Sequence, residues 1–347
     1  MGFEWMYLLA AIGGGMFGAA IGGVPAFVLA GVAAAGSYGY SVIAGTNPDL
    51  HLASLSALGP FGPLLSPNIA FAGGVAAAAY AARRGLHPSG NDTVTPLISL
   101  NRPDVLAVGG LFGGYGYLLQ WAFTNFSPVI AGNIVVTPIV TAIVVSNMTA
   151  RLVFGRAGLT GRPEAGMSRW APSSTHQWLP WQERPAQVLT VGFALALPTA
   201  YLVAQIPAFG FDLGLAISAT WLLFLCLGFK TPVAHHITLG ATIGVLVLGK
   251  VGWGIAFGVA GACIGELAAC LFQYHGDTAI DPPSVALLVL WLVAVSMAPV
   301  LRDASTTVAG VVGVLLVAVT FGLLLLAKRA TIGLPIADES GIEPASA

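Results

Sequence analysis

The sequence contains very little charge. Of its 347 residues, only 8% are Asp, Glu, Lys or Arg, whereas 56% are hydrophobic. An average soluble domain carries about a quarter of charged residues, so a water-soluble globular fold is excluded. Uncharged apolar runs of membrane-spanning length recur along the whole chain, which predicts a multi-pass helical protein of the cell membrane, with the lipid bilayer as its main partner.

Several other features are scarce or missing. The net charge of −1 provides no basic surface, so no nucleic-acid partner is expected. The cysteines lie in apolar segments, where a thiol is a small packing residue, and predict neither disulfides nor a Cys-rich metal site: Cys226, Cys263 and Cys270. No His-Glu-x-x-His run, nucleophile elbow, paired-aspartate motif or phosphate loop occurs, so we expect neither an enzyme nor a bound cofactor.

The hydropathy pattern predicts eleven transmembrane helices. They are expected at about 5–22, 25–45, 67–84, 104–123, 128–150, 187–207, 212–229, 234–249, 251–274, 283–300 and 306–327. Residues 5–46 carry no charge, and we divide them at Gly22-Gly-Val-Pro25 because a single helix of that length would exceed the hydrocarbon thickness.

The basic residues indicate the orientation. If the loop after the third helix is cytoplasmic, eleven of the thirteen Lys and Arg residues lie inside, and only Lys250 and Arg302 lie outside. This is a strong positive-inside bias. It predicts that the N-terminus is outside and the C-terminus is cytoplasmic.

Two pairs of segments resemble each other. The stretch 110–123 is similar to 261–274, and 67–74 is roughly similar to 234–241; we pair Asn68 with His236, one residue beyond the ungapped match. Helices three to five then correspond to helices eight to ten, and a five-helix unit reverses the direction of the next one. The predicted fold is therefore all-α, a 5+5 inverted repeat plus one extra helix.

The repeat defines the expected domains. Residues 1–150 form the first five-helix repeat, 188–300 the second, 301–330 the extra helix and 331–347 a disordered tail. Between the repeats, 151–187 is an Arg-rich linker containing Trp170, Trp178 and Trp181, expected along the cytoplasmic headgroups. A regulatory or partner-docking loop is the alternative for this linker.

Broken segments are expected before helices three and eight. Residues 47–68 are apolar but interrupted by glycines and prolines, and 228–236 is a shorter counterpart. Irregular backbone at membrane depth is tolerated only beside protein or a water-filled cavity, so re-entrant segments would indicate a solute path. An ordinary external loop is the other interpretation.

Polar residues near these breaks are the candidate path. His235 and His236 begin a helix, with Thr238 close behind, and neighbouring histidines point about 100° apart, so at most one faces a given lumen. His236 and Asn68 would approach each other across the pseudo-twofold axis, where a donor and an acceptor on each suit a small polar solute. Asn133 is a weaker candidate. Hydrogen bonding to the backbone is the structural alternative for the histidines.

Glu266 is the one acid expected deep within a helix. An intramembrane carboxylate is costly unless it is paired, protonated or hydrated, which makes Glu266 the candidate coupling-ion site for a proton or cation. Its repeat counterpart in the alignment is Tyr115, which would line the path and donate a hydrogen bond to Glu266. A protonated glutamate bonded to a neighbouring helix is the alternative.

The turn at 274–283 gathers a third group of polar residues. His275, Asp277 and Asp281 are weak candidates for a metal site or an inner gate. Asp281 followed by Pro282 is also a typical start of a helix, which explains that part of the turn without a metal.

These observations predict a transporter or channel that moves a small polar solute or ion between the repeats. A proton- or sodium-coupled carrier using Glu266 is the first alternative; a non-transport membrane subunit or an intramembrane enzyme is the second. The layout resembles ammonium transporters and, in its dipping element, urea transporters, by architecture alone. Small-residue ridges such as Gly14 and Gly18 predict a homo-oligomer, a dimer or trimer.

Overall fold

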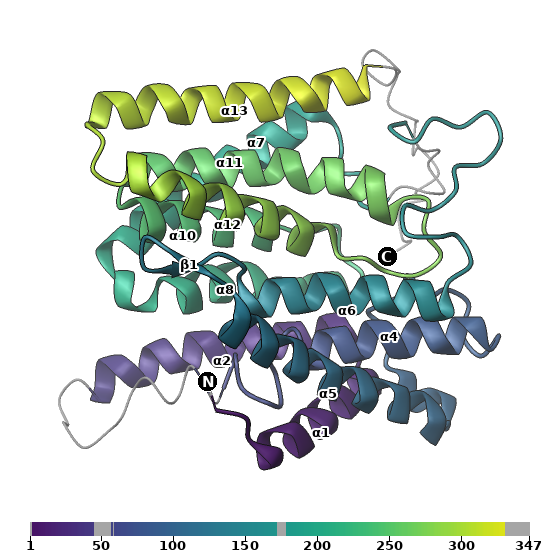
Figure 1. Cartoon of the computed structure of the whole chain (residues 1–347). Helices are drawn as coiled ribbons and strands as arrows, with labels where there is room; N and C mark the ends of the chain where they lie inside the picture. Colours follow the sequence, from purple (N-terminus) through teal and green to yellow (C-terminus); the bar gives the residue numbers. More distant parts are fainter. Residues whose placement is uncertain (1, 45–56, 58, 172–177, 330–347) are drawn as a thin grey trace, which may run out of the picture.

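A computed structural model describes residues 2–44, 57, 59–171 and 178–329 of the chain (Figure 1). The predicted disordered tail 331–347 and residues 47–56 of the first predicted re-entrant segment lie outside the described residues. The helices of the first half are α1 (Trp5–Ile21), α2 (Gly23–Ala44), α4 (Ala70–Arg83), η1 (Leu97–Leu100), α5 (Pro103–Phe126) and α6 (Pro138–Phe154). Those of the second half are α7 (Pro185–Gln205), η2 (Pro207–Phe209), α8 (Gly210–Thr220), α9 (Leu222–Cys226), α10 (His235–Leu248), α11 (Val251–Ala268) with its π-helical continuation η3 (Ala269–Gln273), α12 (Pro282–Leu301) and α13 (Thr306–Lys328).

The chain is predominantly helical, and six helices among the described residues are long and apolar enough to cross a membrane. These are Gly23–Tyr40, Pro185–Gln205, Pro207–Cys226, Val251–Gln273, Pro282–Leu301 and Thr306–Lys328. A chain of this kind is consistent with a helical protein embedded in a membrane.

The predicted breaks between helices are mostly placed correctly. Residues 5–44 form two helices, separated at Gly22, whose φ of 96° is a conformation that favours glycine. Proline takes the first helical position of α5, α6, α7 and α12, where its missing N–H costs no hydrogen bond.

Two predicted boundaries are wrong. The fifth helix was expected from residue 128, but α6 begins at Pro138, because the preceding β-branched residues pair as a hairpin of β1 (Val129–Ile130) and β2 (Asn133–Ile134). The seventh predicted helix, 212–229, lies largely within the span Pro207–Cys226, where a one-residue interruption at Trp221 separates α8 from α9.

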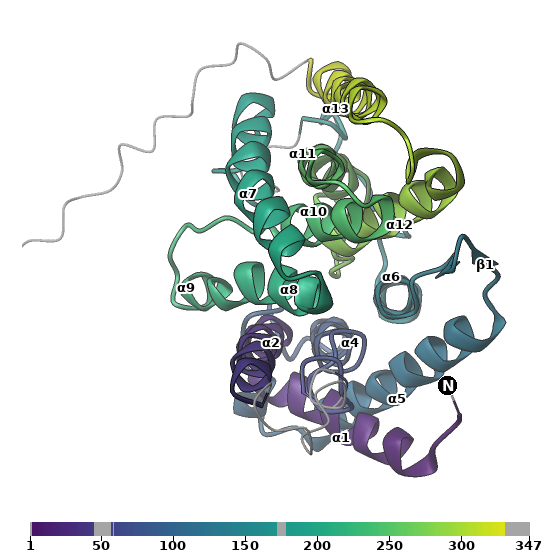
Figure 2. The same cartoon turned by 90° about the vertical axis from the view of Figure 1, so that its left-hand side faces the viewer.

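Two groups of three helices form the body of the protein. In the first half, α1, α4 and α5 all pack on one another, and in the second half α7, α10 and α11 do the same. Figure 2 shows the first group below and the second group above, with α6 and α8 between them. Glycines allow close approach of the backbones: a Cβ on Gly113 would lie 2.7 Å from Cα of Gly15.

Helix pairs join the two halves. α2 packs against α8, and α6 packs against α12. The indole of Trp291 on α12 donates to the carbonyl of Ile134 before α6, whereas Arg151 near the end of α6 donates to Thr278 before α12. α6 and α12 are therefore antiparallel. We call the end of the molecule at Ile134 and Trp291 the hairpin end, and the opposite end the Arg151 end.

The ridge glycines of α1 face the protein interior. A Cβ on Gly14 would collide with the backbone oxygen of Pro63, and one on Gly18 with the backbone oxygen of Ala70. The two positions thus serve packing within one chain and do not support the predicted oligomer contacts, which stay an untested prediction.

Candidate functional site

A cavity of about 940 Å³ lies between the two halves. Its walls come from α2, α6, α8, α10 and α12, together with the loops at both ends. At the hairpin end it is lined by Asn133, Thr137 and Trp291, and at the Arg151 end by Asn91 and Ala279. A cavity of this size and position is typical of a small-molecule site between helices.

The cavity wall is largely apolar, with a few acidic and aromatic side chains. Its lining includes the carboxylates of Asp92, Asp212 and Asp281, and among the described residues it contains no Lys or Arg. Three indoles also line it, those of Trp178, Trp181 and Trp291. The site is therefore better matched to a neutral or positively charged solute than to an anion.

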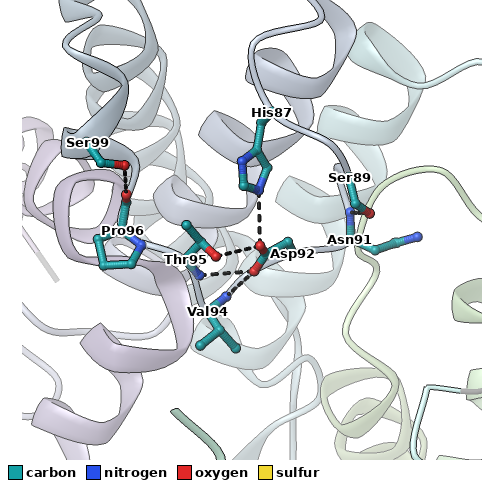
Figure 3. Close-up of polar contacts among 8 residues, drawn as sticks. All are labelled: His87, Ser89, Asn91, Asp92, Val94, Thr95, Pro96 and Ser99. Carbon is teal, nitrogen blue, oxygen red and sulfur yellow. Dashed lines mark hydrogen bonds and ion pairs between the residues drawn. The ribbon is translucent and has the colours of Figure 1, made fainter. Parts of the chain in front are cut away.

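Asp92 is held by the loop between α4 and η1 (Figure 3). Its carboxylate accepts hydrogen bonds from the Thr95 hydroxyl at 2.6 Å and from the backbone amides of Val94 and Thr95, both at 3.0 Å, and His87 Nε2 lies 3.2 Å away. Burial acts to raise the pKa of Asp92, but these hydrogen bonds and the charge of His87 together lower it below its usual value. Asp92 therefore contributes a negative charge to the cavity lining.

Asn91 connects the same loop to the second half. Its side-chain amide donates to the carbonyl of Gly276 at 2.7 Å, and the amide of Gln273 donates to Asn91 Oδ1 at 3.3 Å. Gln273 also accepts from the backbone N–H of Ile280 at 3.1 Å. Both Asn91 and Gln273 line the cavity, so this end is bounded by a polar network contributed by both halves.

His235 and Asp281 form a pair in the wall of the cavity. His235 is the first residue of α10, and its Nε2 lies 3.5 Å from Oδ2 of Asp281. Asp281 is the N-cap of α12 and accepts the backbone N–H of Ser284 at 2.9 Å. The ring of Phe27 from α2 lies 4.8 Å from the imidazole. Within the described structure, Nδ1 of His235 is buried and has no hydrogen-bond partner.

The backbone before α10 is irregular and enters the interior. Gln182 supports it, because its amide donates to the carbonyl of Val233 and accepts the N–H of the same residue, both at 2.9 Å. Trp181 donates to the carbonyl of Thr231 at 3.0 Å. These hydrogen bonds satisfy backbone groups that have no helical partner, as irregular backbone at membrane depth requires.

Asn68 supports the irregular backbone before α4, as Gln182 does before α10. It is fully buried, donates to the Gly116 carbonyl at 3.0 Å and to Gln120 Oε1 at 2.9 Å, and accepts from Ser66 at 2.5 Å. The cavity is lined by Pro67 and Gln120 rather than by Asn68 itself. Asn68 is therefore linked to the cavity through its hydrogen bond with Gln120.

The remaining predicted path residues lie in different surroundings. Asn133 lines the cavity and donates to the carbonyl of Ala131 in the hairpin at 3.0 Å. Thr238 is buried and donates to the carbonyl of Gly214 on α8 at 2.8 Å. Tyr115 lies 3.3 Å from the hydroxyl of Thr149 on α6. Neither Thr238 nor Tyr115 is among the residues that line the large cavity.

His236 and Glu266 meet at a separate, much smaller pocket of about 20 Å³. The ring of His236 packs over Gly265, where a Cβ would lie 2.5 Å from its Cδ2. Glu266 Oε1 lies 2.6 Å from Lys328 Nζ and accepts from the Tyr274 hydroxyl at 2.8 Å. Lys328 also lies 3.6 Å from Glu183. Glu266 is thus a paired carboxylate that ties α11 to α13, outside the lining of the large cavity.

The predicted metal candidates are bound to separate partners. His275 Nε2 lies 3.2 Å from the carbonyl of Arg169, and Asp277 accepts the backbone N–H of Ala157 at 3.2 Å, whereas Asp281 caps α12. Among the residues with a described position, no group of three or more His, Cys, Asp or Glu is arranged to hold a metal ion. The described structure therefore does not bring His275, Asp277 and Asp281 together at one site, and metal binding by this turn stays a weak, untested expectation.

Sequence reasoning missed several cavity residues. Trp178 and Trp181 were expected at the headgroups, but both line the cavity and pack on the central hydrophobic cluster. Asp212, in the first turn of α8, is only 6% exposed. Asp212 offered a signal, because an ionisable residue in an apolar membrane helix usually faces a cavity or a partner.

The chain belongs to a family of unknown function (DUF7973), whose model matches residues 2–172 and 161–310. No curated protein and no solved structure matches the chain.

Proposed function

We propose that this member of the family is a multi-pass membrane transporter or channel, which moves a small polar solute through a path between two inverted five-helix repeats. The observation that carries the proposal is the cavity of about 940 Å³, which is bounded by both halves and reaches from the hairpin end to the Arg151 end. A path at a repeat interface is the usual design of such proteins.

The packing pattern supports the repeat. Each helix of the first half has a counterpart in the second: α1 with α7, α2 with α8, α4 with α10, α5 with α11 and α6 with α12. The contacts correspond as well, because α1, α4 and α5 pack like α7, α10 and α11, while α2 and α6 each pack against their own counterpart. The family model also matches two successive stretches of the chain. α13 is the additional helix and packs on α11.

The direction of the counterparts supports an inverted repeat. α6 and α12 run antiparallel, as the contacts of Trp291 and Arg151 require. α2 and α8 do the same, since Tyr38 in the second half of α2 contacts Phe209 immediately before α8. When each repeat has an odd number of membrane-crossing helices, corresponding helices of the two repeats run in opposite directions across the bilayer.

The glycines refine the register of the repeat. Gly116 on α5 contacts the backbone oxygen of Asn68, and Gly261 on α11 contacts that of His236. The match of Asn68 with His236 is therefore supported, but Gly261 corresponds to Gly116 rather than to Gly110, as the alignment of the two stretches had it. With this register Tyr115 is not the counterpart of Glu266.

The two irregular segments support a solute path. One lies before α4 and is held by Asn68, and the other lies before α10 and is held by Gln182. Both bring the start of a short helix into the interior of the protein. Helices interrupted at corresponding positions in two repeats are a frequent marker of a transport site.

The coupled carrier that uses Glu266 has less support. Glu266 is bound to Lys328 and lies outside the large cavity, so a proton or sodium ion there would act on α13 rather than on the path directly. The proposed orientation, with the N-terminus outside, rests on the distribution of basic residues, and the proposed homo-oligomer has no further support from the packing.

Flux through liposomes containing the purified protein tests the proposal. Light scattering after an osmotic step reports the permeation of small uncharged solutes, and a radiolabelled panel extends the test to ions. Ile143 on α6 lines the cavity and is 5% exposed, so Ile143→Trp should narrow the path and reduce flux. The matched control is Leu111→Trp, at a position on α5 that is 69% exposed. No flux above empty liposomes for any solute, or equal flux in both variants, would contradict the proposal.

A further inference from the structure

Two connections between helices occupy the same place in the two halves of the chain. The connection 127–137 joins α5 to α6, and the turn 274–281 joins η3, the continuation of α11, to α12. In the proposed repeat, α5 corresponds to α11 and α6 to α12, so the two connections are counterparts. Because α6 and α12 run antiparallel, these counterparts lie at opposite ends of the cavity.

The connection 127–137 forms the wall of the cavity at the hairpin end. Asn133 and Ile134 of β2 line the cavity, whereas Val129 and Ile130 of β1 are 63% and 40% exposed. The hairpin therefore separates the cavity from the surface of the molecule. The indole of Trp291 on α12 donates to the carbonyl of Ile134 at 2.9 Å and thereby fastens the hairpin to the second half.

The turn 274–281 forms the corresponding wall at the Arg151 end. Ala279 lines the cavity, whereas Asp277 accepts the backbone N–H of Ala157 in the linker at 3.2 Å. The backbone N–H of Arg162, an exposed linker residue, donates to the carbonyl of His275 at 2.9 Å. The turn therefore lies between the cavity and the exposed part of the linker.

Hydrogen bonds from the first half hold this turn in place. Asn91 donates to the carbonyl of Gly276 at 2.7 Å, and the guanidinium of Arg151 donates to Thr278. Both donors belong to the first half and both acceptors to the second. A movement of the turn away from α6 and the loop at Asn91 would therefore open this end of the cavity.

The turn begins directly after an irregular part of its helix. In η3 the backbone N–H of Tyr274 donates to the carbonyl of Ala269 at 3.0 Å, which is the hydrogen-bond spacing of a π-helix. Such segments are rare and occur frequently at functional sites. The counterpart helix α5 stays α-helical to Phe126. On its other side the turn is bounded by Pro282 and Pro283, whose φ angles are fixed. These features place a hinge for the turn at η3.

We propose that the two corresponding connections are the gates of the path, the turn 274–281 at the Arg151 end and the connection 127–137 at the hairpin end. Each gate is held shut by side chains of the opposite half, so the gates open separately. Gating by corresponding elements of two inverted repeats is a common form of alternating access. This inference deepens the proposed transport function and rests on it for the passage of a solute, but access to the cavity can be measured without transport.

A cysteine inside the cavity reports which gate is open. Leu239 on α10 lines the cavity, and Leu239→Cys in a cysteine-free background provides the reporter. The rate of labelling by a membrane-impermeant thiol reagent is measured in right-side-out and in inside-out vesicles. In separate proteins, a cysteine in place of the exposed Arg84 identifies the side of the Arg151 end, and one in place of the exposed Asp303 identifies the side of the hairpin end.

One variant at each gate should act from one side only. Asp277→Ala removes an acceptor that holds the turn to the linker, so the reporter should be labelled about tenfold faster from the Arg151 side and no faster from the hairpin side. Trp291→Phe should give the reverse pattern, with labelling at least about threefold faster from the hairpin side. Asp104→Ala is the control, because Asp104 is paired with Arg102 and does not line the cavity, and both rates should stay as in the parent protein.

A second variant secures the test at the Arg151 end. Asn91→Ala removes the bond to Gly276 and should also accelerate labelling from the Arg151 side alone. Equal acceleration from both sides in these variants would show general loosening of the fold and contradict the proposal. Unchanged rates in Asp277→Ala, Asn91→Ala and Trp291→Phe, or a reporter that is unreactive from both sides in every protein, would also overturn it.

The outcomes distinguish this inference from the transport proposal. Flux of a solute together with labelling rates that none of the gate variants changes would contradict the gates alone. Side-specific labelling without flux of any solute would contradict transport and leave the two gates of the cavity supported.

Discussion

The ion pair between Lys328 and Glu266 gives a quantitative test of the structure. The side chain of Lys328 is 2% exposed and that of Glu266 is 10% exposed, and their charged atoms lie 2.6 Å apart. Lys328→Met preserves the apolar length of the side chain but leaves the carboxylate without its cation. Loss of one partner of a buried pair costs about 3–5 kcal/mol in the free energy of unfolding, because the remaining charge stays buried and uncompensated.

The double variant isolates the cause. Lys328→Met combined with Glu266→Gln replaces the pair by neutral groups, and such replacements are often close to neutral in stability. We expect it to recover at least half of the loss, with the remainder due to Glu183, which is 3.6 Å from the same ammonium. Lys250→Met is the control, because Lys250 makes only an exposed hydrogen bond to the carbonyl of Arg302 at 3.2 Å.

Equilibrium unfolding in mixed micelles, followed by tryptophan fluorescence, measures all four proteins. The reasoning is refuted if Lys328→Met loses less than about 1 kcal/mol, or if adding Glu266→Gln makes it still less stable. The Glu266→Gln variant also separates the two transport models. Flux that stays dependent on a proton or sodium gradient in this variant would exclude Glu266 as the coupling site.

Three further predictions test orientation, packing and electrostatics. In a cysteine-free background, a cysteine in place of Asp303 should react with an impermeant thiol reagent added to intact cells, whereas one in place of Arg84 should not; the opposite labelling would reverse the orientation. Gly116→Ala should destabilise the protein by at least about 1–3 kcal/mol in thermal or denaturant unfolding, because the new methyl collides with a backbone oxygen, whereas Gly114→Ala meets only side-chain atoms and should cost less. Asp92→Ala should lower the free energy of unfolding at pH 7, because the folded-state pKa of Asp92 lies below its unfolded value. The stabilisation by Asp92 is complete above about pH 4 and disappears as the pH falls through the folded value, so the difference from wild type should vanish in acid. A pH-independent difference would contradict this reasoning.

The helices could be predicted from the sequence, because apolar length and the positions of Gly and Pro are local properties. The break at Gly22 and the start of α12 after Asp281 follow from backbone geometry and capping alone. The hairpin before α6 could not be separated from a helix in the same way, since an apolar run of β-branched residues suits both until its neighbours are known.

The cavity residues were harder to predict. Sequence alone limits the pair His235 and His236 to one pathway residue, but only packing decides that His235 faces the cavity and His236 faces Gly265. The partner of Glu266 is a lysine more than sixty residues later, and no local pattern connects the two. Long-range contacts of this kind are set by the fold and are invisible to periodicity.

The contacts at the two ends of α6 differ in strength. At the hairpin end, Trp291 makes a neutral hydrogen bond between the two halves, beside the ring contact of Tyr38 with Phe209. At the other end, Arg151 is 1% exposed and donates to Thr278 twice, to Phe272 and to Leu159, and hydrogen bonds from a charged donor are roughly twice as strong as neutral ones. A rocking motion of the halves would therefore release the hairpin end first. With the proposed orientation and transport function, the hairpin end would be the outer end, so we expect the outer side of the cavity to open more readily than the inner side.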